Sequence, residues 1–383
     1  MSSETTHITD LLESRSRIDE VDAKILNLFQ ERMRIVADVA EYKKSVGKPI
    51  FDPVREHQRI KDMTEAADPQ FADCVGPLWL MLMELSRARQ SQLIEGTHTL
   101  PEFQLAPLDP CSSVACQGVE GAYSQQAAQI LFPQGEISCA PSWEDVCERV
   151  RQDKAQFGVL PLENSTAGSV DRVYDLLTEG NLSIVGSVRL SIHHDLLAKP
   201  GTHLSDVCEI YSHEQALRQS QRFIDGLGCG IHATIVANTA MAAKMVAQSN
   251  RSDVAAISSP ACAELYGLET LASNVQDQNT NFTRFVCIAP HPIVTPDADR
   301  SSLVLVLPHQ PGSLYRALAR MAALGVNMIK LESRPIPGRE FEFMFYVDIE
   351  GTIDDEPVKT LVFQLEDICE QCKFLGSYAE VEA

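Results

Sequence analysis

The sequence predicts a multidomain protein made of an all-α segment, an α/β domain and a small α+β module of ferredoxin-like order. Residues 8–46 contain no Pro or Gly and carry apolar side chains at spacings of three and four, which is typical of an amphipathic helix. From residue 114 short apolar runs alternate with helical patterns, and beyond residue 300 the order becomes β-α-β-β-α-β. A chain of 383 residues also exceeds the size of one ordinary domain.

The helical segment is predicted over residues 1–96. Its first helix, over residues 8–46, would exceed about 50 Å, which is longer than its own domain can cover. A partner helix from a second copy is therefore expected. Asp52, followed by Pro53, is typical of an N-cap with proline at the first helical position, and this second helix runs to about residue 66. A third helix is predicted over residues 73–95.

A proline-rich linker is predicted over residues 97–112, before an α/β domain over residues 113–290. In that domain runs such as FGVLPL and RFVCIA indicate strands, and runs such as TAMAAKMVAQ indicate helices between them, which favours a largely parallel sheet. A second proline-rich joint precedes the module over residues 300–383.

Composition narrows the class of protein. The net charge of −21 disfavours binding to nucleic acid or an anionic membrane surface. The N-terminus lacks a secretion signal and no apolar run spans a bilayer, so a cytoplasmic protein is expected. Eleven cysteines scattered through apolar segments suit reduced thiols. The CxxC pair, Cys369 and Cys372, stands alone in a predicted helix, so no metal or cofactor is expected.

Two cations share one face of the first helix. Arg32 and Lys43 are eleven residues apart, about 20° around the helix, together with Ile25, Val36 and Val39. Two cations on an apolar stripe favour a small ligand that carries carboxylates. The alternative is that each side chain reaches water or pairs with a nearby acidic residue.

Further polar residues fall near this stripe. Arg15 is about 100° from Arg32, so it would serve the same pocket only from a partner chain. The second and third helices add these polar candidates: Asp52, Arg55, Glu56, Ser86 and Gln90.

The stretches LLESRSRIDEVDAKILNLFQERMRIVADVAEYKK, DPVRE and ELSRARQSQ resemble the all-helical chorismate mutase family, in which two long helices of a dimer interlace. The resemblance places Arg32, Arg55 and a partner's Arg15 around the substrate carboxylates, and Lys43 and Gln90 at the ether oxygen. It implies that the pocket is completed by Asp52, Glu56 and Ser86.

Several loops of the α/β domain follow a strand and open a helix, as in GAYSQQAA, PLENSTAGSV, YSHEQALRQ and ANTAMAAK. Such junctions aim backbone N–H groups at the carboxyl ends of strands, where anions bind. Plain helix capping, as by Ser212 with Gln215, is the alternative. PLENSTAG is more specific, because Glu163 and Asn164 directly follow an apolar strand.

Residues 115–290 resemble prephenate dehydratase, and NFTRF is the most specific of the matching motifs. The resemblance implies two α/β lobes of the periplasmic-binding-protein type with the site between them. It gives Thr283 the role of acid for the departing ring hydroxyl, and it implies that the cleft is lined by Glu163, Asn164, Ser212, Gln219 and Arg284. The sequence departs from the family pattern at Val119, Ala122 and Glu214.

His193 and His194 also fall in this domain. Successive side chains of a strand point to opposite faces, so at most one of these histidines can reach a site. A structural or hinge role is the preferred interpretation for both.

The C-terminal module resembles the amino-acid-binding ACT module that is fused to such dehydratases, with Ser313 where Ala is common. The resemblance implies feedback inhibition by L-phenylalanine bound between two chains. The implied effector residues are Gly312, Ser313, Leu314, Asn327, Glu332, Ser333, Arg334 and Pro335.

Together these resemblances predict a homodimeric or larger enzyme of phenylalanine biosynthesis that takes chorismate through prephenate to phenylpyruvate. The alternatives are a non-catalytic amino-acid sensor and a dehydratase that prefers arogenate. No residue of the sequence separates prephenate from arogenate.

Overall fold

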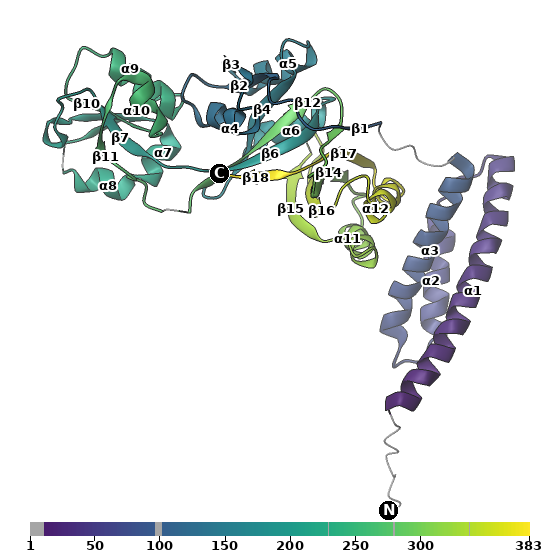
Figure 1. Ribbon diagram of the computed structural model, residues 1–383. Coiled ribbons are helices and arrows are strands. Elements are labelled where there is room, and N and C mark those ends of the chain that lie inside the picture. The colour runs from purple at the N-terminus through teal and green to yellow at the C-terminus, as the bar shows by residue number, and fades with distance from the viewer. Residues whose placement is uncertain (1–10, 96–101, 229, 279, 337) are drawn as a thin grey trace, which may run out of the picture. The chain divides into compact units, whose positions relative to one another are not determined.

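The computed structural model describes residues 11–95, 102–228, 230–278, 280–336 and 338–383 (Figure 1). The chain divides into two compact units. The first comprises residues 1–100 with 363–368, and the second comprises residues 101–362 and 369–383. Within the described residues, no helix is both long and apolar enough to cross a membrane.

The first unit contains three helices, α1 (Leu11–Val46), α2 (Pro53–Ala66) and α3 (Ala72–Glu95), and both α1 and α2 pack along α3 (Figure 1). The predicted start of α2 is confirmed, because Asp52 accepts a hydrogen bond from the backbone N–H of Arg55 at 3.1 Å and Pro53 is the first helical residue. With 36 residues, α1 is about 54 Å long.

Two faces of α1 differ in burial. Val36 and Ala40 are buried in the unit, whereas apolar residues on another face are exposed. The exposed apolar residues of α1 with heptad spacing are Ile18, Val21, Ile25, Leu28, Ile35, Val39, Tyr42 and Val46. Of the apolar residues expected beside Arg32 and Lys43, only Val36 is therefore buried in a single chain.

The α/β domain has two lobes. The sheet of the first lobe has the order β18-β6-β12-β4-β2-β3, with β5 paired to β4. Its strands are β2 (Ser113–Gln117), β3 (Glu136–Ala140), β4 (Phe157–Asn164), β5 (Gly168–Ser169), β6 (Ser183–Ser191), β12 (Phe282–Ala289) and β18 (Glu380–Glu382), and its helices are α4 (Tyr123–Leu131), α5 (Trp143–Arg151) and α6 (Asp171–Glu179). A short parallel pair joins β1 (Gln104–Leu105), inside the predicted linker, to β13 (Ile293–Val294).

The second lobe is inserted between β6 and β12, so the chain passes twice between the lobes. Its sheet has the order β11-β7-β10-β8-β9. Its elements are β7 (Asp195–Ala198), β8 (Glu209–Ser212), α7 (Glu214–Gln219), α8 (Gln221–Gly226), β9 (His232–Ile235), α9 (Thr239–Gln248), β10 (Val254–Ser258), α10 (Ala261–Tyr266) and β11 (Glu269–Ala272), with a 3-10 turn at Leu204–Asp206.

The expectation of largely parallel sheets is wrong. In the first lobe β12 pairs antiparallel with both β4 and β6, and in the second β7 pairs antiparallel with β10 and β11. The returning strands reverse direction because the chain crosses between lobes at these points. The helical pattern of residues 214–224 is interrupted at Ser220, between α7 and α8.

The C-terminal module has the predicted β-α-β-β-α-β order, with the sheet order β15-β16-β14-β17. Its elements are β14 (Arg300–Val306), α11 (Ser313–Ala323), β15 (Met328–Pro335), β16 (Phe343–Glu350), α12 (Glu356–Glu366) and β17 (Gln371–Tyr378). Cys369 and Cys372 lie beyond the end of α12, so their placement in a helix is wrong. The chain then continues into β18, which pairs with β6 of the first lobe.

Candidate active sites

The first candidate site lies among the three helices and is built around Arg32. Its guanidinium donates to the backbone carbonyl of Leu82 at 3.0 Å and to the hydroxyl of Ser86, both on α3. Partial burial lowers the pKa of Arg32, an effect that the nearby carboxylate of Glu56 opposes. Arg32 and Ser86 were predicted from distant parts of the sequence, and the structure brings them into contact.

Lys43 lies near the same group. Its Nζ donates to the backbone carbonyl of Ile50 at 2.5 Å, and burial lowers its pKa against the raising effect of Asp52 and Glu56. Glu56 also binds Arg87, a cation of α3 that sequence reasoning did not select. Arg87 further lies over the ring of Phe51, 5.0 Å from its centroid. Glu56 therefore lies near three cations, Arg32, Lys43 and Arg87.

Gln90 is buried in the helical unit, whereas Arg15 is exposed. Gln90 is 6% exposed, its Nε2 donates to the backbone carbonyl of Ser86 at 3.1 Å, and its Oε1 has no hydrogen-bond partner among the described residues. Arg15 is exposed and lies about 25 Å along α1 from Arg32, since 17 residues separate them. Arg15 therefore cannot reach Arg32 within one chain. Arg55 is also exposed, beside Lys43.

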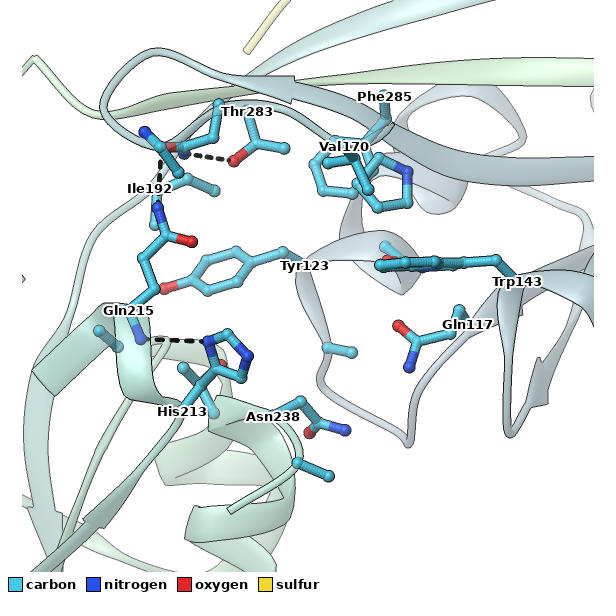
Figure 2. A pocket seen from close by; sticks show the side chains of 18 of the residues that line it. Gln117, Tyr123, Trp143, Val170, Ile192, His213, Gln215, Asn238, Thr283 and Phe285 are labelled. Carbon is cyan, nitrogen blue, oxygen red and sulfur yellow. Dashed lines mark hydrogen bonds between the residues drawn. The ribbon is translucent and has the colours of Figure 1, made fainter. Parts of the chain in front are cut away.

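The second candidate site is a cavity of about 640 Å³ between the two lobes of the α/β domain. Figure 2 shows Thr283 and Gln215 toward one end of it and Trp143 and Gln117 toward the other, with the ring of Tyr123 between them. Residues at the starts of α4, α5, α6 and α9 line the wall, among them Tyr123, Trp143, Val170 and Thr239. The starts of α4, α6 and α9 belong to predicted strand-to-helix junctions, whereas the start of α5 does not.

The polar groups that line this cavity are mostly uncharged. Among its described lining residues there is no Lys or Arg, and the one carboxylate, Glu144, accepts a hydrogen bond from Arg172 at 2.7 Å. Side-chain amides, hydroxyls and helix N-termini supply hydrogen-bond donors instead. Helix N-termini favour negative charge, so the cavity suits an anion held by oriented dipoles.

Asn164 and Thr283 meet at the ends of β4 and β12, where they are cross-strand partners. The Nδ2 of Asn164 donates to the Oγ1 of Thr283 at 2.9 Å. The Oδ1 of Asn164 accepts from the backbone N–H groups of Thr166 and Ala167, both at 3.0 Å, which fixes the orientation of the amide. Because Thr283 accepts from Asn164, its own hydroxyl hydrogen is left to point at a ligand.

The two lobes are bridged beside this pair. Gln215, on α7 of the second lobe, donates to the Oδ1 of Asn164 at 3.2 Å, and Gln219 donates to the hydroxyl of Thr166. Asn281 completes the group, since it accepts from Asn164 at 2.8 Å and donates to Gln219 at 3.0 Å. Hydrogen bonds between the two lobes thus also hold the side chain of Asn164.

His194 forms part of the same wall. It is 2% exposed, and burial lowers its pKa to about 4. Its Nε2 lies 3.3 Å from the Oε1 of Gln219, which can only accept, so this nitrogen carries the hydrogen of a neutral ring. A purely structural role was preferred for His194, but the residue also lines the cavity. Its neutral imidazole is not a proton donor near pH 7.

Three residues predicted to line the cleft are placed elsewhere. Glu163 and Arg284 are the immediate neighbours of Asn164 and Thr283, and because side chains alternate along a strand they point to the opposite side of the sheet. Ser212 is fully buried, and its hydroxyl donates to the backbone carbonyl of Ile257 at 2.6 Å. Its predicted capping is also wrong, because His213 caps α7. Gln219 does line the cavity, as predicted.

The predicted effector residues belong to two segments of the C-terminal module. Gly312 has a positive φ of 82° where α11 begins, next to Ser313 and Leu314. Asn327 immediately precedes β15, which carries the other four predicted residues. Glu332 accepts from the hydroxyl of Ser169, and Arg334 pairs with Asp171 and with Asp175, the latter at 3.3 Å. These two side chains thus face the α/β domain, and Ser333 and Pro335 are exposed.

Sequence reasoning missed several residues of the cavity. These are Gln117, Tyr123, Trp143, His213, Gln215, Asn238 and Asn281. Asn281 and Gln215 had a signal, since they lie in the motifs NFTRF and YSHEQALRQ. Trp143 had none, because it begins an ordinary amphipathic helix and reaches the cavity only through the fold.

Two family models match the segments of the chain that contain the candidate sites. The family model described as chorismate mutase type II matches residues 14–91, and that described as prephenate dehydratase matches residues 114–293. The structure is also similar to that of prephenate dehydratase from Arthrobacter aurescens in complex with L-Phe, with 29% identity and a TM-score of 0.64. The similarity covers 70% of this chain and 90% of that chain.

Two relatives match different shares of the chain. An arogenate dehydratase/prephenate dehydratase of Arabidopsis thaliana is 40% identical over 277 residues, which cover 69% of this chain and 72% of that protein. A bifunctional chorismate mutase/prephenate dehydratase of Enterobacter agglomerans is 32% identical over 379 residues, which cover 96% of this chain and 95% of that protein. The chain, with both domains in the same order, therefore belongs to the bifunctional chorismate mutase/prephenate dehydratase family.

Proposed function

We propose that the helical unit rearranges chorismate to prephenate and that the cavity of the α/β domain converts prephenate to phenylpyruvate. The observation that carries the second assignment is the hydrogen bond between Asn164 and Thr283, which leaves the hydroxyl hydrogen of Thr283 directed at a ligand. The chain is thus an isomerase and a lyase of phenylalanine biosynthesis.

The mutase reaction is an intramolecular rearrangement that needs no nucleophile. The site has to hold a dicarboxylate in a compact conformation and stabilise the charge that develops on the ether oxygen as its bond to carbon breaks. Arg32, with Arg55 and a partner's Arg15, holds the carboxylates. Lys43 and the remaining N–H of Gln90 face the ether oxygen. Asp52, Glu56 and Ser86 orient these cations, as their contacts with Arg32 and Lys43 support.

In the dehydratase reaction the ring carboxylate leaves as CO₂ and its bonding electron pair makes the ring aromatic as the ring hydroxyl departs. Thr283 donates a hydrogen bond to that hydroxyl, which takes up a proton that comes from solvent and leaves as water as its bond to carbon breaks. A threonine hydroxyl is a weak acid, but the aromatic product makes the elimination favourable, so a well-placed donor suffices. The helix N-termini and amides of the cavity hold the carboxylates.

Two further assignments rest on the family. The C-terminal module binds L-phenylalanine through the residues of α11 and β15 named above, and binding lowers dehydratase activity. The chain forms a homodimer through α1, whose exposed apolar face supports association with a second copy.

The dehydratase assignment is tested by Thr283→Ala. Loss of the donor removes assistance to the departing hydroxyl, so phenylpyruvate formation from prephenate should become undetectable, while the mutase rate of the same preparation stays at the wild-type value. Retained dehydratase activity would refute the role of Thr283. An assay with arogenate in place of prephenate decides which substrate the cavity prefers.

The mutase assignment is tested by the reciprocal variant, Lys43→Ala. Loss of the cation opposite the ether oxygen should lower the rate of chorismate loss by about 10²-fold or more, with dehydratase activity unchanged. The two variants act as controls for each other, because each leaves intact the activity that the other removes. A wild-type mutase rate in Lys43→Ala contradicts the proposed site.

A further inference from the structure

A second, smaller cavity lies where the C-terminal module meets the first lobe, and Asn164 lines both this cavity and the larger one. It has a volume of about 450 Å³ and is lined by Glu163, Arg284, Arg300, Lys330 and Glu380, among others. Glu163 and Arg284 are cross-strand partners, as Asn164 and Thr283 are. Each residue of the catalytic pair is therefore bonded through the backbone to one residue of this charged pair.

The charged pair is held from the module. Lys330 of β15 binds Glu163, and the guanidinium of Arg284 binds Asp348 of β16 at 2.6 Å and the hydroxyl of Tyr378 of β17 at 2.7 Å. Arg284 also lies 2.8 Å from Glu380 of β18. Every strand of the module except β14, together with β18, thus contributes a contact to this pair.

The ion pair between Arg284 and Asp348 is shielded from water. The side chain of Arg284 is 9% exposed, and that of Asp348 is 8% exposed. Burial alone would lower the pKa of Arg284, but Tyr378 and Asp348 overcome it and raise the pKa. The pKa of Lys330 is raised in the same way, against desolvation, by Tyr174 and Glu163. Both side chains are therefore stabilised in their charged forms.

The backbone of β12 is irregular next to Thr283 and Arg284. The pairing of β12 with β4 changes register between Arg284 and Phe285, so Thr283 and Arg284 lie beyond a bulge. Bulges near active sites re-aim side chains, and β4 ends at Asn164. On its β4 edge the end of β12 that carries Thr283 lies beyond the bulge, and on its other edge it stays paired with β6 through Phe282. The residues next to Asn164 and Thr283 in the chain, Glu163 and Arg284, form ion pairs with the module.

We propose that Glu163 and Arg284 are positioning residues, and that the C-terminal module, through Lys330, Asp348 and Tyr378, holds Asn164 and Thr283 in the geometry that dehydration requires. The inference rests on the proposed dehydratase function. A displacement of β15 or β16 would reach Thr283 through a chain of direct contacts. The module thus has a physical route to the reaction centre that involves no contact with the substrate.

The test compares two half-buried lysines of the module that both reach the first lobe. Lys330 binds Glu163, whereas Lys373 donates to the backbone carbonyls of Leu177 and Thr178, at 2.9 and 2.8 Å, away from the catalytic pair. Full-length Lys330→Met should lower kcat for prephenate about 10-fold with little change in KM, since small misplacements of reacting groups slow the chemical step. Lys330→Arg should restore most of the rate, and Lys373→Met should keep the wild-type kcat.

Two further readouts separate positioning from loss of structure. Calorimetric titration with phenylpyruvate should give the same number of sites per chain in Lys330→Met as in the wild type, and the mutase rate should be unchanged. The proposal is overturned by an unchanged kcat in Lys330→Met, by an equal loss in Lys373→Met, or by a loss of binding sites that accounts for the lower rate. A wild-type chain that converts no prephenate would overturn the proposed function and this inference together.

Discussion

At the scale of single residues, burial determines the protonation state of His194. Its ring lies in the wall of the cavity, and desolvation lowers its pKa from 6.5 to about 4. The hydrogen bond to Gln219 favours the charged form but does not compensate. The neutral ring keeps its single N–H directed at Gln219 and so supports the hydrogen bonds around Asn164.

This burial predicts a pH dependence of stability. Between about pH 6.5 and pH 4 the unfolded chain binds a proton that the folded chain excludes, so His194 makes the fold less stable as the pH falls through that range. The expected loss is about 2 kcal/mol at pH 5 relative to pH 7. In His194→Gln the urea midpoint should fall less between these pH values. An identical pH dependence in both proteins would contradict the neutral buried ring.

At the scale of elements, the junction of β17 with β6 depends on one glycine. Gly376 has a φ of 148°, and a Cβ at this position would lie 2.0 Å from the backbone oxygen of Ile184 in β6. No other residue type fits without separation of the two strands. The close approach lets the chain run on from β17 into β18, which pairs with β6 from Glu380 to Glu382.

Gly376→Ala should therefore destabilise the α/β unit by about 3 kcal/mol or more, because the methyl group meets backbone rather than a movable side chain. Gly201→Ala is the matched control, since Gly201 also has a positive φ, of 84°, but no atom lies within 4 Å of its Cβ position. That variant should cost only about 1 kcal/mol of backbone strain. Urea unfolding of the two proteins measures the difference, and equal midpoints would show that β17 does not need the close approach.

At the scale of the whole molecule, the helical unit presents an apolar surface that a single chain leaves exposed. The heptad spacing of these side chains on α1 is the pattern by which one long helix packs against another. Arg15 lies too far along α1 to reach Arg32 in the same chain, which independently favours a site shared between two copies. Both observations belong to one proposal, a dimer in which each α1 completes the other's pocket.

Ile25→Glu tests this dimer. Ile25 is 58% exposed, so the substitution should not disturb the folded monomer, but a carboxylate in an apolar helix interface should disfavour association. The mutase rate should fall about 10-fold or more at low protein concentration and recover partly as the concentration rises, while dehydratase activity stays constant. Gln30→Glu, also exposed on α1 but off the apolar stripe, is the control and should match the wild type. A concentration-independent, wild-type mutase rate in Ile25→Glu would exclude the shared site.

Several parts of the structure follow from sequence alone because their causes are local. Asp52 caps α2 because the side chain and the orphan N–H it satisfies are three residues apart. The order of elements in the C-terminal module follows from apolar periodicity. The apolar run before PLENSTAG also marked Asn164 locally, whereas Thr283 was selected through the resemblance of NFTRF to the dehydratase family.

Other parts were decided only by the tertiary structure, because they depend on which strands pair and on which side each residue falls. Arg284 follows Thr283 directly, yet strand alternation and the buried partners Asp348 and Tyr378 turn it away from the cavity and toward the module. The hydroxyl of Ser212 donates to the backbone carbonyl of Ile257, on a neighbouring strand and 45 residues later in the chain. The residue types at a site are thus local properties of the chain, whereas the face of the sheet on which each acts is set by long-range pairing and by the burial of charge.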